Sequence, residues 1–378
     1  MAHSNSVFNQ FLALISRSEF NSLIKKHNAG RTPRKFSWWN HFVHLLFIQI
    51  TERKSMRAGI RNMRVSKQKV YHLGAKPASR STFSDANNTR SASFFEALFQ
   101  KLFQKASAVA PKHKLPFKNP LYSLDSSTID LNKASFPWAM FRKNKSGIKL
   151  HTLLDHNGYL PSVCLVSEAK TSDIKKAKTL KLEANSIVVF DRAYIDYNWF
   201  IQLGSQGIFF VTRQKSNAKY TVKARNRATG QGVTSDQIVT MQDKPELTLR
   251  RIGYKDPETG KHYKFLTNNF SLDAKTVADI YKERWEIEIF FRWIKQNLKI
   301  KAFVGRSENA VLIQIYVALI LYLLLSLLKF MSKIPLSLQK MLQILQLNLF
   351  SKGGIEELFK PPKKRKISSK NSLLDLMN

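Results

Sequence analysis

Apolar residues recur at helical spacing through the first 112 residues of the chain, and strand-like runs replace this pattern from residue 118. In the N-terminal part, apolar positions three and four apart line one side of each predicted helix. Ser55 precedes one of these helices, where its side chain can cap the first turn. The pattern predicts an all-helical domain over residues 1–112, with helices within 36–51, 55–64 and 78–104.

Beyond residue 118, short β-rich runs alternate with helical segments. The first run, PLYSLDSSTIDL, covers residues 120–131, and the next two flank the HNG sequence at 156–158, which is typical of a hairpin turn. A helix is predicted over 172–184, and strands are predicted within 186–196 and 207–215. This order of elements predicts an α/β fold with a central mixed sheet.

Residues 216–264 interrupt that alternation. They begin basic and turn-rich and continue with strand-like segments, so we interpret them as a β insertion between two parts of one core, residues 118–215 and 265–330. Residues 331–378 hold another short helix and the basic run KPPKKRKISSK. Such a run is typical of a solvated tail, and a phosphate-binding arm is the second interpretation.

The segment YKERWEIEIFFRWIKQNLKI, residues 281–300, predicts one amphipathic helix. The polar side carries Tyr281, Arg284, Glu288 and Lys295, which fall in a stripe about 60° wide at 100° per residue. A solvated helix face explains such a stripe as well as a functional site does, so the rest of the chain must decide. The apolar positions are Ile280, Ile287, Phe290, Phe291, Ile294 and Leu298.

Residues 311–328, VLIQIYVALILYLLLSLL, are nearly all apolar and long enough to cross a membrane. Gln314 and Ser326 interrupt the run, and the charged helix directly precedes it. A helix buried on all sides in a large core has the same composition. We therefore expect a core helix and no membrane partner.

The charge balance points to a polyanionic partner. Lys and Arg number 62 against 26 Asp and Glu, which gives a net charge of +36. Nucleic acid is the leading partner for such an excess, and an anionic membrane surface is the second. A hydrophobic content of 43% indicates a packed globular protein rather than a ribosomal or chromatin-type protein.

Basic residues crowd the segment from 53 to 69 in the N-terminal domain. Two short helices around the turn VYHLGAKP, residues 70–77, would suit a helix-turn-helix that lays cations along DNA phosphates. A helical bundle with a solvated basic face is the alternative. We interpret residues 1–112 as a DNA-binding domain.

The single Cys164 excludes an intrachain disulfide and a cysteine-based zinc site, and it fits a reducing compartment. His41 and His44 lie three residues apart, but no third metal ligand is evident, which favours ordinary core or surface histidines. The N-terminus lacks a basic start followed by a long apolar run, so no secretory signal is expected. These features predict a cytoplasmic protein.

Three acids are candidates for a common site. Asp125 lies within a predicted strand, and Asp191 follows the buried run IVVF at a strand end, where open α/β sheets place ligands. Glu288, on the polar side of a helix packed on the same sheet, would complete a cluster. Three carboxylates can hold two Mg²⁺ ions about 3.5–4 Å apart, which serve phosphoryl transfer. Mn²⁺ is the expected substitute.

Each acid alone also has a structural explanation, because Asp125 could cap a turn and Asp191 could pair with the arginine that follows it. Asp155 suits the hairpin, Asp173 suits a helix N-terminus, and the two other glutamates of the charged helix point away from its stripe. The competing acids are Asp130, Asp155, Asp173, Glu283 and Glu286.

The spacing Y-x-x-R-x-x-x-E-x6-K, filled here by the four residues of the stripe, resembles the signature of DDE transposases of the insertion sequence 4 family. LDSSTIDL and VVFDRAYIDY resemble the family's first-Asp strand and second-Asp segment, and KLHTLLDHNGYLP and FFVTRQK resemble the hairpin and the strand that follow them. RSTFSDANNTR resembles part of the helical domain found on family members. The similarity covers most of the chain from about residue 30 to 330.

The resemblance implies a ribonuclease-H-like core with a β insertion, and a transposase that cuts and joins DNA at transposon ends with Mg²⁺. The implied metal ligands are Asp125, Asp191 and Glu288, and the implied contacts to phosphates of the cleaved end are Tyr281, Arg284 and Lys295. Water would cleave the element's end, and the freed 3′-hydroxyl would attack target DNA without a covalent protein intermediate. A homodimer on DNA, at the prokaryotic nucleoid, is the implied assembly.

Two departures from the family pattern matter. Ala193 replaces the Gly expected after Asp-Arg, a change that a backbone outside the left-handed region accepts. Residues 205–270 contain no Trp on which a flipped base could stack, although Phe or Tyr could substitute, so a hairpin intermediate stays open. Two other functions stay open as well: a DNA-binding protein that has lost the chemistry, and a ribonuclease-H-like nuclease without strand joining.

Overall fold

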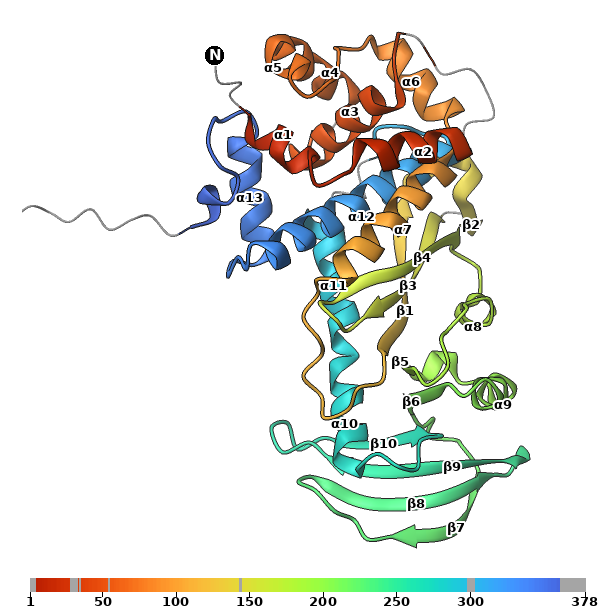
Figure 1. The fold of residues 1–378 in the computed structure, drawn as a ribbon. Helices are drawn as coiled ribbons and strands as arrows, with labels where there is room; N and C mark the ends of the chain where they lie inside the picture. The colour runs from red at the N-terminus through yellow and green to blue at the C-terminus, as the bar shows by residue number, and fades with distance from the viewer. Residues whose placement is uncertain are drawn as a thin grey trace, which may run out of the picture.

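The computed structural model describes residues 5–27, 33, 35–53, 55–142, 145–297 and 303–360. Figure 1 shows helices gathered at one end of the molecule, a mixed sheet in the middle, and an antiparallel extension of that sheet at the other end. The chain is therefore a mixed α/β protein with a helical N-terminal region, as predicted.

The N-terminal region consists of helices joined by short turns, and serine side chains cap several of them. Ser55 accepts the N–H of Ala58 at 3.2 Å, as the sequence predicts, and Ser79 caps the α6 helix in the same way. The helices are α1 (Val7–Leu12), α2 (Arg17–His27), α3 (Trp38–Ile50), α4 (Met56–Val65), α5 (Lys67–Tyr71), α6 (Arg80–Thr89) and α7 (Ala92–Ser107).

Helix α3 is buried along its whole length because its sequence is apolar nearly all round. The His41 Nε2 atom lies 2.7 Å from Asn87 Oδ1, and His44 Nδ1 lies 2.7 Å from the Asn40 carbonyl oxygen. Burial lowers the pKa of His41 to about 3 and that of His44 to about 4. Both are neutral histidines in the core, and the sequence had favoured this interpretation over metal ligands.

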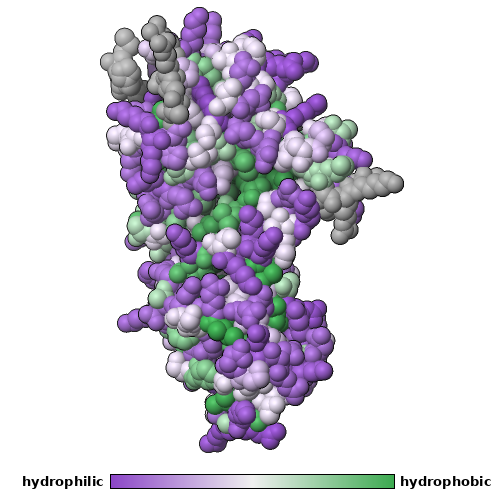
Figure 2. Space-filling model, turned by 90° about the vertical axis from the view of Figure 1, so that its right-hand side faces the viewer, coloured by the Kyte–Doolittle hydropathy of each residue, from purple (hydrophilic) through white to green (hydrophobic). Residues whose placement is uncertain are grey.

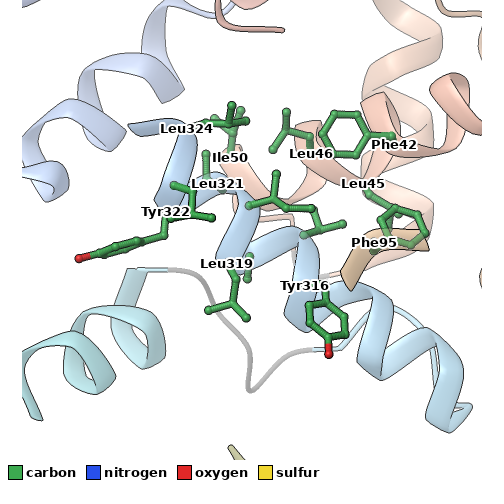
Figure 3. Packing of buried hydrophobic residues seen from close by; sticks show 14 of the residues in the cluster. Phe42, Leu45, Leu46, Ile50, Phe95, Tyr316, Leu319, Leu321, Tyr322 and Leu324 are labelled. Carbon is green, nitrogen blue, oxygen red and sulfur yellow. The ribbon is translucent and has the colours of Figure 1, made fainter. Parts of the chain in front are cut away.

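The long apolar segment forms α12 (Glu308–Met331), which is long and apolar enough to cross a membrane, yet 94% of its apolar window is buried inside the protein. Figure 3 shows Leu321 and Leu324 of α12 on the side of Ile50 and Leu46 of α3, whereas Tyr316 and Leu319 point to the other side of the helix. The prediction of a core helix is confirmed. One hydrophobic cluster thus joins the N-terminal helices to the rest of the chain.

The central sheet has β1 in the middle, with β3 antiparallel on one side and β5 parallel on the other. β4 continues the sheet beyond β3, and β6 continues it beyond β5, which gives the mixed sheet of a ribonuclease-H-like core. These strands are β1 (Leu121–Leu131), β3 (Lys145–Asp155), β4 (Leu160–Glu168), β5 (Ile187–Phe190) and β6 (Phe209–Arg213), and the short η1 (Pro137–Ala139) and β2 (Met140–Arg142) precede β3.

The predicted insertion does not form a separate sheet. β10 pairs with β6, and β9, β8 and β7 follow outward, so the insertion extends the central sheet. β7 was expected as a basic turn-rich segment; it forms an edge strand, whose mostly exposed side chains need no apolar run. These strands are β7 (Tyr220–Asn226), β8 (Val233–Met241), β9 (Lys244–Lys255) and β10 (His262–Thr267).

The single helix predicted over 281–300 is divided at Arg284 into α10 (Ala274–Glu283) and α11 (Trp285–Asn297). The N–H of Arg284 bonds the Tyr281 carbonyl at 3.2 Å, and the N–H of Ile287 bonds the Arg284 carbonyl at 3.3 Å. These three-residue steps tighten one turn, and the apolar residues before and after it pack in different hydrophobic clusters. All its predicted apolar residues up to Ile294 are buried, and Leu298 lies outside the described residues.

The helix predicted over 172–184 is also shorter than expected, because only α8 (Asp173–Ala177) is helical. Leu180 and Leu182, two apart, pack against the core from non-helical chain. The other helices of this half are η2 (Arg192–Tyr194), α9 (Tyr197–Ser205), α13 (Leu338–Asn348) and η3 (Glu357–Phe359), while the basic run from 361 onward lies outside the described residues.

Candidate active site

Asp125 lies in β1 at the point where its neighbour β5 ends. Asp125 pairs with Thr152 of β3, whereas the pairing of β1 with β5 stops one residue earlier, at Leu124 and Phe190. Its side chain is 22% exposed, and Oδ1 accepts the N–H of Ser126 at 2.7 Å. Because β5 ends next to Asp125, the carboxylate of this strand residue is accessible to solvent.

Asp191 directly follows β5, at the same edge of the sheet as Asp125, because β1 and β5 run parallel. Its Oδ1 accepts the N–H of Ala193 at 2.7 Å and so begins the short η2 turn. Ala193 is not among the residues with positive φ, so the backbone at this position does not require glycine.

Arg284, at the break between α10 and α11, joins the third acid to the first. Its Nη2 donates to Glu288 Oε1 at 2.6 Å, and its Nη1 lies 3.6 Å from Asp125 Oδ2. The side chain is 13% exposed, and its Nε is a buried donor with no hydrogen-bond partner within the described chain. The tightened turn at Arg284 thus places one guanidinium between two of the predicted site acids.

Electrostatics links the three acids. The pKa of Asp125 is raised to about 6, chiefly by burial and also by the negative charges of Asp191 and Glu288, which together outweigh the lowering by the Ser126 N–H and Arg284. Burial lowers the pKa of Arg284, but Glu288, Tyr281 and Asp125 together outweigh it and raise the pKa above the usual value. Arg284 is therefore the counter-cation of the three acids, whose combined negative charge is larger than the charge that Arg284 supplies.

Tyr281 and Lys295 lie on either side of this group along the same pair of helices. The Tyr281 ring packs on Phe265 of β10, with ring centroids 4.9 Å apart, and lies 5.7 Å from the Arg284 guanidinium carbon. Lys295 is half-buried on α11, about 10 Å beyond Glu288 at 1.5 Å per residue. The predicted polar stripe is a partly buried surface and not a fully solvated face.

The arrangement brings Asp125 and Glu288 to one guanidinium and places Asp191 near enough to affect Asp125 electrostatically. Across the described part of the chain, no three His, Cys, Asp or Glu side chains are close enough together to hold one metal ion in common. Asp125 and Glu288 therefore meet through Arg284, Asp191 acts on Asp125 electrostatically, and the three acids of the described chain do not form a closed ligand set.

The competing acids have other partners or positions. Asp155 accepts the N–H of Asn157 in the hairpin turn at 2.8 Å. Asp173 begins α8, accepts the Ser126 hydroxyl at 2.6 Å and pairs with Lys149 at 3.1 Å. Asp130 is exposed near the end of β1. Each position agrees with the role that the sequence suggested or leaves the acid outside the cluster.

A second network behind the site, buried at Ser123 and His156 and partly exposed at Tyr159 and Glu283, was not predicted. Ser123 Oγ lies 2.7 Å from His156 Nε2, and His156 Nδ1 lies 3.8 Å from Glu283 Oε2. Tyr159 donates to the same Glu283 oxygen at 3.0 Å. Ser123 is two residues before Asp125, and Glu283 directly precedes Arg284, so the network joins the strand of one site residue to the turn that carries another. The only sequence signal was the HNG hairpin turn.

Figure 2 shows a face dominated by hydrophilic side chains, with hydrophobic side chains gathered in a hollow at mid-height. The net charge of +36 suits a polyanionic partner.

Comparison with protein families gives two matches. Residues 116–324 match the family described as "Transposase DDE domain", and residues 3–76 match a domain of unknown function. The first match spans β1 to α12 and contains every site residue described above.

The chain is also similar to bacterial proteins that carry transposase names. It is 31% identical to y4zB of Sinorhizobium fredii over 74% of this chain and 80% of the relative. It is 33% identical to the IS5377 protein of Geobacillus stearothermophilus over 57% of this chain and 58% of the relative. It is 26% identical to the IS4SA protein of Synechocystis over 69% and 75%.

One solved structure, the piggyBac transposase synaptic complex with hairpin DNA, aligns with 95% of this chain and 82% of that chain. The sequence identity is 13% and the TM-score is 0.45.

Proposed function

This protein belongs to the transposase DDE domain family, and we propose that it is a cut-and-paste transposase whose active site is built from Asp125, Asp191 and Glu288. As a family member it is an enzyme that acts on DNA. The observation that supports the site is the meeting of Asp125 and Glu288 at Arg284, beside Asp191, where β5 ends.

Members of this family use a divalent metal ion, and the residues present fit such an ion. The candidate ligands are all carboxylates, which Mg²⁺ and Mn²⁺ prefer. The raised pKa of Asp125 indicates that this acid needs more positive charge than Arg284 supplies. Asp125, Asp191 and Glu288 would hold two ions, which when bound activate the attacking oxygen and stabilise the leaving oxygen.

When metal ions neutralise the three acids, the Arg284 side chain can bind a phosphate instead. Its guanidinium carries donors in a planar fork that matches a phosphate, and its Nε has no partner among the described residues. We therefore assign Arg284 to the phosphate of the cleaved end, with Tyr281 next to it and Lys295 further along α11. Phe265 holds the Tyr281 ring in place for this contact.

The proposed reaction has two steps at the same site. Water attacks the phosphodiester at the transposon end, and the bond to the flanking strand breaks, which frees a 3′-hydroxyl. That hydroxyl then attacks a phosphodiester of target DNA, and the target strand's own 3′-oxygen leaves. No bond forms between protein and DNA, so the side chains only bind, orient and neutralise.

DNA is the partner of this family. We propose that two copies assemble on two transposon ends and that the protein works at the bacterial nucleoid. The burial of α12 and the bacterial relatives support the proposal of a cytoplasmic protein. Its net charge of +36 would hold it on DNA at low salt.

The test uses isosteric variants that remove charge without removing volume. Asp125→Asn and Glu288→Gln should each abolish Mg²⁺-dependent cleavage of DNA that flanks the coding sequence, because each removes a metal ligand. Binding to the same DNA in EDTA should persist. Asp130→Asn is the matched control, since Asp130 lies exposed on the same strand. Cleavage by either site variant at the wild-type rate would remove that residue from the site.

The same assay separates the two alternatives. A protein that has lost the chemistry would bind the DNA but would not cleave it with Mg²⁺ or Mn²⁺. A nuclease without strand joining would cleave, but a pre-cut end with a free 3′-hydroxyl would not be joined to a target plasmid. The proposed function requires both cleavage and joining.

A further inference from the structure

A polar cleft separate from the three acids lies between the N-terminal helices and the segment that precedes α12. Its volume is about 640 Å³, and its walls carry Arg57 of α4, Arg80 of α6 and Arg306 of the segment before α12. All three arginines are exposed, and none forms an ion pair with any described residue. Three cationic side chains therefore face one cavity without an internal partner.

The cleft has no acid in its lining. The remaining polar lining consists of serine hydroxyls and the amides of Asn87 and Asn88. Glu308 lies in the first turn of α12 and Asp85 lies on α6, but neither of them lines the cleft. A cleft lined by hydrogen-bond donors and by no carboxylate favours an anionic ligand.

Three helices begin at this cleft. Ser55 caps α4, Ser307 caps α12, and Arg80 is the first residue of α6. The N-terminal end of a helix carries a partial positive charge and unpaired N–H groups, which favour phosphate. The helix ends and the arginines therefore favour the same kind of ligand.

The cleft is a fixed structure that joins the two halves of the protein. Ser307 donates to Asn88 Oδ1 at 2.7 Å, and Asn309 donates to the carbonyl oxygens of Asn87 at 2.8 Å and Arg90 at 2.7 Å. Its two walls are thus held together by hydrogen bonds between sequence segments more than 200 residues apart. A phosphate bound here would contact the helical region and the catalytic half at once.

The cleft is also within reach of a duplex seated at the candidate active site. The end of β1 at Leu131 lies about 20 Å beyond Asp125 at 3.3 Å per residue. The chain that follows contacts the cleft segment, because Trp138 donates to the Arg306 carbonyl at 2.8 Å and Phe136 packs on Phe303. One turn of B-DNA, about 34 Å, is enough to bridge the two places.

We propose that this cleft, formed by Arg57, Arg80 and Arg306 at three helix N-termini, binds the phosphate backbone of the DNA duplex whose end lies at the candidate active site. The proposal rests on the proposed function and adds a second anchoring point for the substrate. It predicts that these arginines govern affinity and its salt dependence, and not the chemical step.

The test measures DNA binding in EDTA, where no cleavage can occur, on a duplex of about 40 base pairs from the flanking DNA. Arg57→Gln, Arg80→Gln and Arg306→Gln should each lower the slope of log affinity against log salt concentration by about 1, and the triple variant by about 3. Lys101→Gln, on an exposed position of α7, is the control and should leave the slope unchanged. Wild-type slopes in all three variants would overturn the proposal.

A cross-link locates the DNA directly. The single Cys164 is buried, and burial raises the pKa of its thiol to about 12, so it will not compete. Ser84→Cys, in the cleft wall, should form a disulfide with a thiol tethered to a backbone phosphate, whereas Ser205→Cys, exposed at the end of α9, should not. Equal cross-linking at both positions would overturn the assignment.

Because both measurements need no catalysis, their failure is distinct from failure of the proposed function. A wild-type protein that does not cleave would refute the transposase mechanism and leave these binding results to stand.

Discussion

Two arginines of this molecule, Arg250 and Arg284, each meet carboxylates, and the two clusters are built differently. In the β extension, Arg250 Nη2 lies 2.7 Å from Asp236 Oδ2 and its Nε lies 3.0 Å from Oδ1, with side chains 8% and 4% exposed. Its Nη1 donates to the Leu272 carbonyl oxygen. This pair is closed, because charge and hydrogen bonds are matched within the fold.

The cluster at Arg284 is open by comparison. One short contact holds Glu288, the contact to Asp125 is longer at 3.6 Å, and the Nε has no partner in the described chain. Asp125 carries a raised pKa because burial and two neighbouring acids outweigh one cation. The comparison teaches that an arginine–carboxylate contact alone does not identify a functional site. An excess of acids over cations, together with an arginine donor that has no partner, does identify one.

Breaking the closed pair should have the largest effect on stability. Arg250→Gln leaves Asp236 as a buried, unmatched charge, which should lower the free energy of unfolding by about 3–5 kcal/mol. Urea unfolding monitored by circular dichroism measures this loss. Cleavage per folded molecule should not change, so a variant of normal stability would contradict the structural role of the pair.

The corresponding change at the open cluster should affect activity instead. Arg284→Gln should reduce single-turnover cleavage at saturating DNA by about 10²–10³-fold, because a charged donor to the reacting phosphate is lost. Its unfolding free energy should change far less than that of the Arg250 variant. Normal cleavage together with a large loss of stability would make Arg284 a structural residue like Arg250.

The excess negative charge of the open cluster predicts a pH-dependent stability. The pKa of Asp125 is raised from 3.8 to about 6 in the folded protein, so the folded state binds the proton more tightly and this group's destabilisation grows as pH rises from about 4 to 6. In EDTA, Asp125→Asn should therefore stabilise the protein by about 2 kcal/mol at pH 7.

That gain should disappear below pH 4, where Asp125 is neutral in both states. Thermal unfolding of wild type and variant across pH 3.5 to 7 measures the difference, and Asp130→Asn serves as the control on the same strand. A stabilisation by Asp125→Asn that does not vary with pH would mean that the pKa of Asp125 is not raised in the folded protein.

The sequence was sufficient to select candidate residues whose relation is local. The stripe Tyr281, Arg284, Glu288, Lys295 depends on helical spacing alone, and the acids of β1 and β5 depend on where two apolar strands run. The division of the helix at Arg284 could not be predicted, because α10 packs in one hydrophobic cluster and α11 in another, and no Gly or Pro marks the break.

Contacts that depend on strand register were equally out of reach. His156 meets Ser123 only because β1 and β3 pair so that Tyr122 faces Asp155, and a slip by one residue would turn Ser123 away. The core shared by α3, α7 and α12 could not be predicted for a related reason. An apolar face shows that a helix is buried but does not show which element covers it. Since α3 and α7 pack on α12, deleting residues 1–110 would expose that core, so surface substitutions are the sounder test of the N-terminal region.

The network behind the site gives a smaller expected effect. His156→Asn keeps a polar group but breaks the link between Ser123 and Glu283, so the turn at Arg284 is held less firmly and cleavage at saturating DNA should fall about tenfold. DNA affinity in EDTA should be unchanged. Tyr159→Phe, which removes one hydrogen bond to Glu283, is the milder control. A loss of affinity without a change in rate would assign His156 to DNA binding.

The smallest effect is expected at Lys295, which lies furthest along the stripe from the open cluster. Lys295→Ala should weaken binding to a pre-cut end and lower its salt slope by about 1, because one phosphate contact is lost. Lys340→Ala, exposed on α13, should leave the slope unchanged. If both variants bind with the wild-type slope, the phosphate-binding surface ends near Arg284, and the open cluster alone holds the cleaved end.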